Sequence, residues 1–260
     1  MSETKITNND YFSPEAAKQF WSVSQFKSFN RCEAAGLAES LHEYERPETE
    51  ALLIGSYVDA YFSGEIERFQ ERNGEKMFTK KGELYAKFHQ ANAMIDAIEN
   101  QPLMMEYLRG DKQVVMTSEL FGLPWKIKAD VLNPRRIVDL KTVRDFEDIY
   151  DASYGGRRSW IEYWGYDIQG AIYQKVVEAE TGQKLPFFIV AVTKERIPDV
   201  DVIEIPQHVL DAALGLVEAK IERFDLIKTQ QVEPIRCERC DYCKQTKVLR
   251  EVHEYKLNEE

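Results

Sequence analysis

The sequence WKIKADVLNPRRIVDLKTV, residues 125–143, decides the fold that we expect for this chain. Two short segments within it, 125–132 and 136–142, are rich in β-branched residues, and an Asn-Pro-Arg turn separates them, as is typical of neighbouring strands. A Gly-Leu-Pro turn connects them to a similar segment at 113–120. Together the three segments predict an antiparallel, three-stranded meander.

The regions on either side of this meander favour helices and two further strands. Residues 186–193, PFFIVAVT, form a continuous apolar run, which predicts a central strand buried on both faces. The other expected elements are helices at 13–44, 49–62, 80–100, 159–181 and 207–229 and a strand at 200–205. This order predicts an α/β fold in which helices flank a mixed β-sheet.

Three charged side chains are expected to meet at one edge of this sheet. Asp139 and Lys141 lie two residues apart on one strand, so the alternation of strand side chains puts both on one face and Leu140 in the core. The turn before this strand brings Asp130 back beside them. Two carboxylates and a lysine suit a divalent cation and a phosphate substrate. The same pattern also fits a hairpin whose charges are simply solvated.

Four cysteines form the most specific local pattern in the chain. Cys237, Cys240 and Cys243 follow a C-x2-C-x2-C spacing, and Cys32 is the only other cysteine. Three thiols at this spacing can hold an iron–sulfur cluster, with a fourth ligand supplied from far upstream. A structural Zn²⁺ held by four thiolates is the alternative.

The acidic pattern resembles the catalytic core of a known nuclease superfamily. Asp130, Asp139 and Lys141 resemble the D-x-K form of the PD-(D/E)xK core, in the RecB-type and lambda-exonuclease-like branch. Upstream, the segment from Gly55 to Asp59 resembles the G-x-x-x-H segment of that branch, with Asp in place of His. An aspartate can also bind Mg²⁺ or Mn²⁺ through oxygen.

Two more patterns fall in the order that this branch has. Gln169 and Tyr173 resemble its Q-x-x-x-Y motif, and their i, i+4 spacing puts both on one helix face. Ser24, Phe29 and Cys32 resemble the S-x4-F-x2-C opening of members that carry an iron–sulfur cluster. In overall look the chain is similar to phage exodeoxyribonuclease VIII-like (RecE-like) nucleases.

The resemblance implies a restriction-endonuclease-like core that hydrolyses DNA phosphodiester bonds with Mg²⁺ or Mn²⁺. It implies an exonuclease that processes duplex ends for phage-type recombination or repair. The residues with implied roles are Asp59, Asp130 and Asp139 as metal ligands, Lys141 as the group that positions water, and Gln169 and Tyr173 as orienting groups. It also implies a [4Fe–4S] cluster on the four cysteines. The implied partners are DNA (duplex ends or single strands), a single-strand annealing protein and further copies of the chain.

Three parts are expected along the chain: a helical N-terminal part at 1–110 that contributes Cys32 and Asp59, the nuclease core at 111–232, and a cysteine-rich segment at 233–260 that packs back on the N-terminal part. The formal net charge is −11. This charge disfavours broad, non-specific phosphate binding and leaves a local basic channel as the route for DNA.

The sequence contains no evident secretory signal and no membrane-spanning apolar run. We therefore expect a cytoplasmic protein, in a bacterium or a phage-infected host. Two other functions fit the same residues. One is a catalytically silent DNA-binding protein with a structural metal cluster, and the other is a metal-dependent phosphoesterase acting on small substrates.

Overall fold

The computed structural model describes residues 6–8, 10–152, 154–249, 251–252 and 254. It divides into two compact units. The first comprises the described residues up to Val23 together with Arg46–Ile221, and the second comprises Ser24–Glu45 and the described residues from Glu222 onward. The expected acidic site lies in the first unit and the four cysteines lie in the second. The three-part division expected from the sequence stays a prediction.

A five-stranded mixed sheet forms the core of the first unit, with strand order β1-β2-β3-β6-β7. Its strands are β1 (Asp111–Leu120), β2 (Leu123–Asn133), β3 (Arg136–Val143), β6 (Phe187–Thr193) and β7 (Val200–Glu204). Antiparallel pairing joins β1 to β2, β2 to β3 and β6 to β7, whereas β3 and β6 run parallel. The predicted meander and the predicted α/β class with a mixed, helix-flanked sheet are confirmed.

Strand β6 lies inside the sheet, because it pairs with β3 on one side and with β7 on the other. Its residues Ile189, Val190, Ala191 and Val192 are all 0% exposed. A strand buried on both faces has no polar face, and this explains the unbroken apolar run from which it was predicted.

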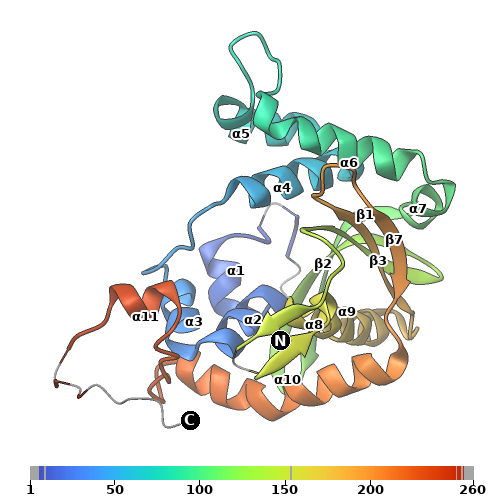
Figure 1. Cartoon of the computed structure of the whole chain (residues 1–260). Helices are drawn as coiled ribbons and strands as arrows, with labels where there is room; N and C mark the ends of the chain where they lie inside the picture. The colour runs from blue at the N-terminus through green and yellow to red at the C-terminus, as the bar shows by residue number, and fades with distance from the viewer. Residues whose placement is uncertain (1–5, 9, 153, 250, 253, 255–260) are drawn as a thin grey trace. The chain divides into compact units, whose positions relative to one another are not determined.

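Helices cover both faces of the sheet, with α4 and α6 on one side and α9 on the other (Figure 1). The helices on the first face are α4 (Glu50–Ser63), α6 (His89–Glu99) and α7 (Pro102–Tyr107). They share a core with Val138, Leu140 and Val190 of the sheet. Helix α9 (Tyr166–Thr181) packs against β1, β2 and β6.

The ends of α4 show why local sequence predicted this helix well. Thr49 begins it, since its Oγ1 accepts a hydrogen bond from the Leu52 N–H at 3.2 Å. Gly64 ends it with a left-handed φ of +77°, a conformation that glycine adopts without strain. The helix expected at 49–62 is therefore confirmed.

The helix expected at 80–100 is wrong in its first part. The Thr79 Oγ1 accepts hydrogen bonds from the backbone N–H groups of Lys81 and Glu83, and this local turn competes with helix formation. Helix α6 begins only at His89. The apolar spacing of the stretch could not reveal the turn, because the turn depends on one side-chain oxygen.

Other differences concern helix breaks and short elements. Helix α5 (Ile66–Met77) was not predicted, because its sequence is mostly polar and only Phe69 and Met77 are buried. The region expected to be helical at 13–44 contains α1 (Pro14–Gln19), α2 (Val23–Arg31) and α3 (Glu33–Ser40). The other elements are η1 (Ala86–Phe88), β4 (Ile149–Asp151), β5 (Gly156–Arg158), α8 (Trp160–Tyr163), α10 (Gln207–Lys228) and α11 (Asp241–Gln245). Throughout the described residues, every helix is too short or too polar to cross a lipid bilayer.

Aromatic packing and the ion pair between Arg223 and Glu33 connect distant segments of the second unit. Phe224 packs on Phe26 and Phe29, with ring centroids 5.4 and 5.7 Å apart. The guanidinium of Arg223 donates to both carboxylate oxygens of Glu33 at 2.8 Å, a two-point pairing that fixes the orientation of both groups. Helix α11 packs on α3 in this unit.

We predict that Gly170→Ala destabilises the first unit. A Cβ at this position would lie 2.5 Å from the Phe187 ring and 2.9 Å from Leu210, so α9 would have to move away from the sheet. The expected loss is about 1–3 kcal/mol of unfolding free energy, measured by urea denaturation. Gly215→Ala on α10 is the matched control, since a Cβ there meets nothing within 4 Å. Equal stability of the two variants would contradict this packing.

Candidate active site

Strands β2 and β3 stop pairing at one point inside the sheet, which we call the fork. Their last pair before it is Val131 with Val138, whereas β3 stays paired with β6 as far as Val143. Asp130 and Asp139 are the first residues past the last pair on their strands. The Asp130 Oδ2 accepts a hydrogen bond from the Leu140 N–H at 2.9 Å, so a carboxylate replaces the missing ladder bond.

The side of β2 that β3 leaves is paired with another segment. The Trp21 N–H donates to the Pro124 carbonyl at 2.7 Å, and the Lys126 N–H donates to the Trp21 carbonyl at 2.8 Å. The rings of Trp21 and Trp125 pack 6.1 Å apart. These two hydrogen bonds cover the part of the β2 edge around Trp125, where a free strand edge would otherwise be exposed.

Asp139 is the most constrained acid of the site. It is 1% exposed, its Oδ1 accepts from the Gln169 Nε2 at 2.7 Å, and its Oδ2 forms an ion pair with the Lys141 ammonium. Leu140 packs in the core on the opposite face, as the alternation of β3 predicts. The sequence motif therefore folds into a buried, paired carboxylate.

Helix α9 contacts both strands of the fork. Gln169 reaches Asp139 on β3, and one turn later the Tyr173 hydroxyl donates to the Lys128 carbonyl of β2 at 2.9 Å. Burial raises the pKa of Tyr173 well above its usual value, so the phenol stays protonated and can donate. The two residues that the sequence paired by their spacing thus connect α9 to β2 and β3.

Asp59 approaches the fork from α4. One turn earlier, a Cβ on Gly55 would lie 2.6 Å from the Thr142 Oγ1, so only a residue without a side chain lets α4 lie this close to β3. Asp59 and Asp130 line a cavity of about 10 Å³, together with Lys112 and Leu140. A space of that size holds about one water molecule.

The charges of the acids act on one another through the protein interior. Burial raises the pKa of Asp130 well above its usual value, and the charges of Asp139 and Asp59 raise it further. Burial also raises the pKa of Asp59, against the opposing effect of Lys141. For Lys141, burial by itself favours the neutral amine, but Asp139 and Asp130 outweigh it and the pKa is raised.

These acids are chemically suited to hold a divalent cation. When they are ionised, the three carboxylates outnumber the one ammonium, and carboxylate oxygens are the ligands that Mg²⁺ and Mn²⁺ prefer. Within the described residues, however, the group whose ligand atoms all lie within 4.8 Å of one another is formed by the cysteines and not by the acids. Asp139 is paired with Lys141 instead. The assignment of Asp59, Asp130 and Asp139 as metal ligands stays a prediction.

The position of Gln113 is a feature of the site that the sequence did not reveal. The ladder of β1 and β2 pairs Lys112 with Val131 and Val114 with Ala129, so Gln113 lies opposite Asp130 in the register of the two strands. Its φ is +52°, which a non-glycine residue adopts only under some strain. Its side chain extends toward the acids, and Nε2 lies 3.5 Å from the Asp130 Oδ1.

Two tyrosines near the acids were also missed. The Lys141 ammonium lies over the Tyr166 ring, 5.2 Å from its centroid. Tyr166 precedes Gln169 by three residues on α9, and this spacing could have placed it on the same helix face. The second is Tyr11. Burial raises the pKa of its phenol, and the nearby charge of Asp130 raises it further. No local pattern connects Tyr11 to the motif.

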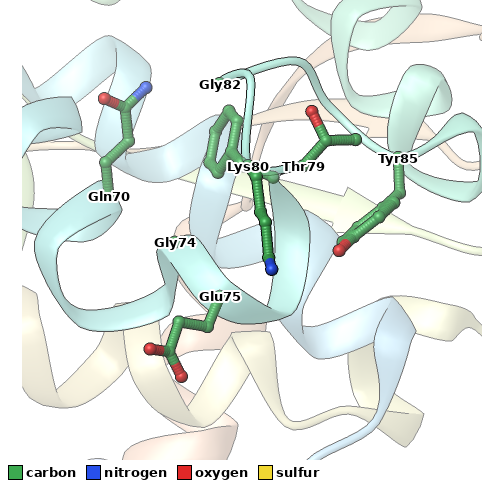
Figure 2. A pocket seen from close by; sticks show the side chains of 8 residues that line it. Gln70, Gly74, Glu75, Thr79, Lys80, Gly82 and Tyr85 are labelled. Atoms are coloured by element: carbon green, nitrogen blue, oxygen red, sulfur yellow. The ribbon is translucent and has the colours of Figure 1, made fainter.

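A second, open groove lies away from the acids. It has a volume of about 580 Å³ and lies between α5 and the turn that follows it. Figure 2 shows the side chains of Gln70, Glu75 and Tyr85 spread around this groove and not converging on one point. A groove without convergent polar groups lacks the usual features of a catalytic site, so we place the candidate site at the fork.

The four cysteines converge within the second unit. All four Sγ atoms lie within 4.8 Å of one another, and the Cys243 Sγ is 3.6 Å from that of Cys32 and 3.9 Å from that of Cys237. The Cys240 N–H donates to the Cys237 Sγ at 3.3 Å, a contact that favours a thiolate. These residues can bind a metal. A tetrahedral ion with bonds of about 2.3 Å would separate its sulfurs by about 3.8 Å, close to the spacing here.

Comparison with known proteins identifies the family of this fold. Residues 22–246 match the model of a family described as a PDDEXK-like domain of unknown function (DUF3799). A crystal structure from Eubacterium rectale with the name "Putative exonuclease" is 42% identical, covers 96% of this chain and 97% of its own, and has a TM-score of 0.90.

Two further comparisons add no support. The structure of SSO0001 is 18% identical over 80% of this chain and 88% of its own, and its TM-score of 0.28 is too low for an argument. Among curated proteins no match was found.

We predict that the buried acids make the metal-free protein less stable as pH rises. A carboxyl whose pKa is raised by folding binds its proton more tightly in the native state, so the unfolding free energy falls as pH rises above about 4. Asp130→Asn should reduce this slope and raise stability at neutral pH by about 0.5–2 kcal/mol. Urea denaturation in EDTA at pH 5 and pH 8 tests it, with exposed Asp241→Asn as control. A wild-type stability that is equal at both pH values argues against like charges buried at the fork.

Proposed function

Because the chain belongs to the family of PDDEXK-like domains of unknown function, we propose that it is a metal-dependent nuclease that hydrolyses DNA phosphodiester bonds. The observation that carries the proposal is the meeting of Asp130, Asp139 and Lys141 at the fork. Asp139 is buried, Asp130 and Lys141 are half-buried, and their charges act on one another. Solvated charges on a hairpin would have been exposed instead. The alternative that the residues form only a polar strand surface is therefore disfavoured.

Asp59, Asp130 and Asp139 would hold Mg²⁺ or Mn²⁺ at this site. A bound divalent cation polarises the phosphate and lowers the pKa of a bound water. The support is the donor chemistry of three neighbouring carboxylates. The pKa values of two of them, Asp130 and Asp59, are raised by burial and then by the charge of Asp139.

Lys141 is proposed to act as an ammonium group. Its raised pKa keeps it protonated at neutral pH, so it can donate hydrogen bonds but cannot accept a proton in this state. An ammonium at this point can hold a water molecule and offset negative charge that develops on the phosphate. Tyr166 beneath it supports this position through its ring.

Gln169 and Tyr173 are proposed as positioning residues. Gln169 holds the orientation of the Asp139 carboxylate, and Tyr173 holds the backbone of β2 beside it. Neither interaction moves a proton. Their effect would be to keep the two strands of the fork, and hence the acids, at a constant separation.

We further propose that the enzyme digests DNA from its ends. The support for this is the resemblance to RecE-like nucleases together with the name of the 42% identical protein. A role in phage-type recombination or repair, a single-strand annealing partner, self-assembly and a cytoplasmic location are proposed on the same resemblance.

We predict that wild-type protein degrades linear duplex DNA with Mg²⁺ or Mn²⁺, and that Lys141→Ala lowers kcat about 100- to 10,000-fold. The control is Lys175→Ala, which removes an exposed lysine of α9 and should match wild type. Covalently closed circles should resist digestion if the enzyme needs an end. Equal background rates for wild type and Lys141→Ala would favour the silent DNA-binding protein. Turnover of small phosphodiesters without DNA cleavage would indicate a small-substrate phosphoesterase.

The cysteines are proposed to bind a structural metal centre. The sequence resemblance favours a [4Fe–4S] cluster, whereas the close spacing of the thiols matches a single tetrahedral Zn²⁺. In a cubic cluster each thiolate binds a different iron, so the sulfurs would have to lie farther apart than they do here.

We predict that purified protein contains one metal centre per chain and that Cys243→Ser abolishes it and lowers stability. Metal analysis and a visible spectrum measure this. Brown protein with about four irons identifies the cluster, and colourless protein with about one zinc identifies the single ion. Metal-free protein as stable as the metal-bound form would overturn the assignment. The control is Ser118→Ala, a serine substitution far from the cysteines along the chain, which should keep the metal content of wild type.

A further inference from the structure

Two adjacent aromatic residues, Tyr11 and Phe12, form an ordered pair directly before helix α1. Their rings meet edge to face, with centroids 4.9 Å apart and planes at 84°. The next residue, Ser13, begins the helix, since its Oγ accepts from the Ala16 N–H at 3.1 Å. Its own N–H donates to the Asp10 carbonyl at 3.0 Å. The pair is thus held in place by hydrogen bonds on either side. The matched family segment begins after it, at residue 22.

The aromatic pair lies along one row of β2 side chains. Period two puts Lys126, Lys128 and Asp130 on the same face of that strand. The Lys126 Nζ donates to the Tyr11 carbonyl at 2.6 Å and lies 4.8 Å from the Tyr11 ring centroid. The Lys128 Nζ lies 5.5 Å from the centroid of the Phe12 ring. The row leads from two lysines directly to an acid of the proposed active site.

The lysines of this row give the acidic protein a local positive charge. Lys126 is 3% exposed, and within the described part of the chain its contacts are the carbonyl and ring of Tyr11 and no carboxylate. Lys128 is half-buried and contacts Phe12. A polyanion needs such a local field to approach a protein whose net charge is −11.

Phe12 is the exposed member of the pair. Its side chain is 76% exposed, whereas Tyr11 is half-buried. A single exposed apolar residue is common on protein surfaces. Here, however, the ring packs edge to face on Tyr11, lies beside an ammonium and adjoins a row that ends at Asp130. An aromatic face beside a cation is the combination with which proteins hold an unpaired base and its phosphate.

We propose that Phe12 and Lys128 form a binding subsite for a nucleotide of single-stranded DNA next to the proposed cleavage site. The base stacks on the Phe12 ring, and the phosphate pairs with the Lys128 ammonium. The base must be unpaired, because a base within a duplex offers no free face. The choice of DNA as the ligand rests on the proposed function, while the subsite itself binds without hydrolysis.

The test measures binding of a single-stranded oligonucleotide that contains the fluorescent base 2-aminopurine, in Ca²⁺ and without Mg²⁺. Phe12→Ala should weaken binding about tenfold and abolish the quenching that stacking causes, while Phe12→Trp should retain both. Phe12→Leu keeps an apolar side chain and should fail like Phe12→Ala. Lys128→Met should weaken binding and reduce the slope of log K against log salt by about 0.7.

Matched controls are Tyr150→Ala and Lys184→Met, which remove an exposed aromatic and an exposed lysine elsewhere on the first unit. Wild-type binding and quenching by Phe12→Ala or Phe12→Leu would overturn the subsite. Cleavage of DNA is measured separately with Mg²⁺. Phe12-dependent binding without cleavage would support the subsite and reject the nuclease. Cleavage by wild type together with an unchanged KM in Phe12→Ala would support the nuclease and reject the subsite. If the protein neither binds nor cleaves DNA, both proposals are rejected.

Discussion

Burial of like charges at the fork is the constraint on which the rest of this fold depends. Carboxylates inside a protein are unstable unless hydrogen bonds and opposite charges surround them. Here the Leu140 N–H donates a hydrogen bond to Asp130. Gln169 donates a hydrogen bond to Asp139, and Lys141 forms an ion pair with it. The end of the β2–β3 ladder, the position of α9 and the close approach of α4 all provide these partners. The β2–β3 pairing ends directly beside these acids.

Stability and the proposed function make opposite demands at the fork. A glutamine with a left-handed backbone, a missing stretch of ladder and a cluster of acids each lower stability by themselves. The surrounding core offsets them, because β6 is fully buried and helices cover both faces. Sites of this kind persist in folded proteins when the rest of the structure determines their geometry.

Local signals in the sequence were sufficient for much of the fold. Alternation and turn residues predicted the meander, and the cap residues Thr49 and Gly64 predicted α4. The D-x8-D-x-K spacing predicted the meeting of Asp130, Asp139 and Lys141, because period two and one turn determine it. The contributions of Gln113 and Tyr11 could not be predicted. The first depends on a left-handed backbone conformation at a non-glycine residue, and the second on a segment more than 100 residues away in sequence from Asp130.

The cysteine cluster has a consequence for biosynthesis. Cys32 and Cys243 are 211 residues apart, yet their sulfurs lie 3.6 Å from each other. At the usual rate of translation, roughly 10–40 s separate the synthesis of these two residues. During that interval Cys32 lacks the thiols of Cys237, Cys240 and Cys243. A nascent polypeptide that ends before Cys237 therefore cannot assemble the group of four thiols, however well its sheet has folded.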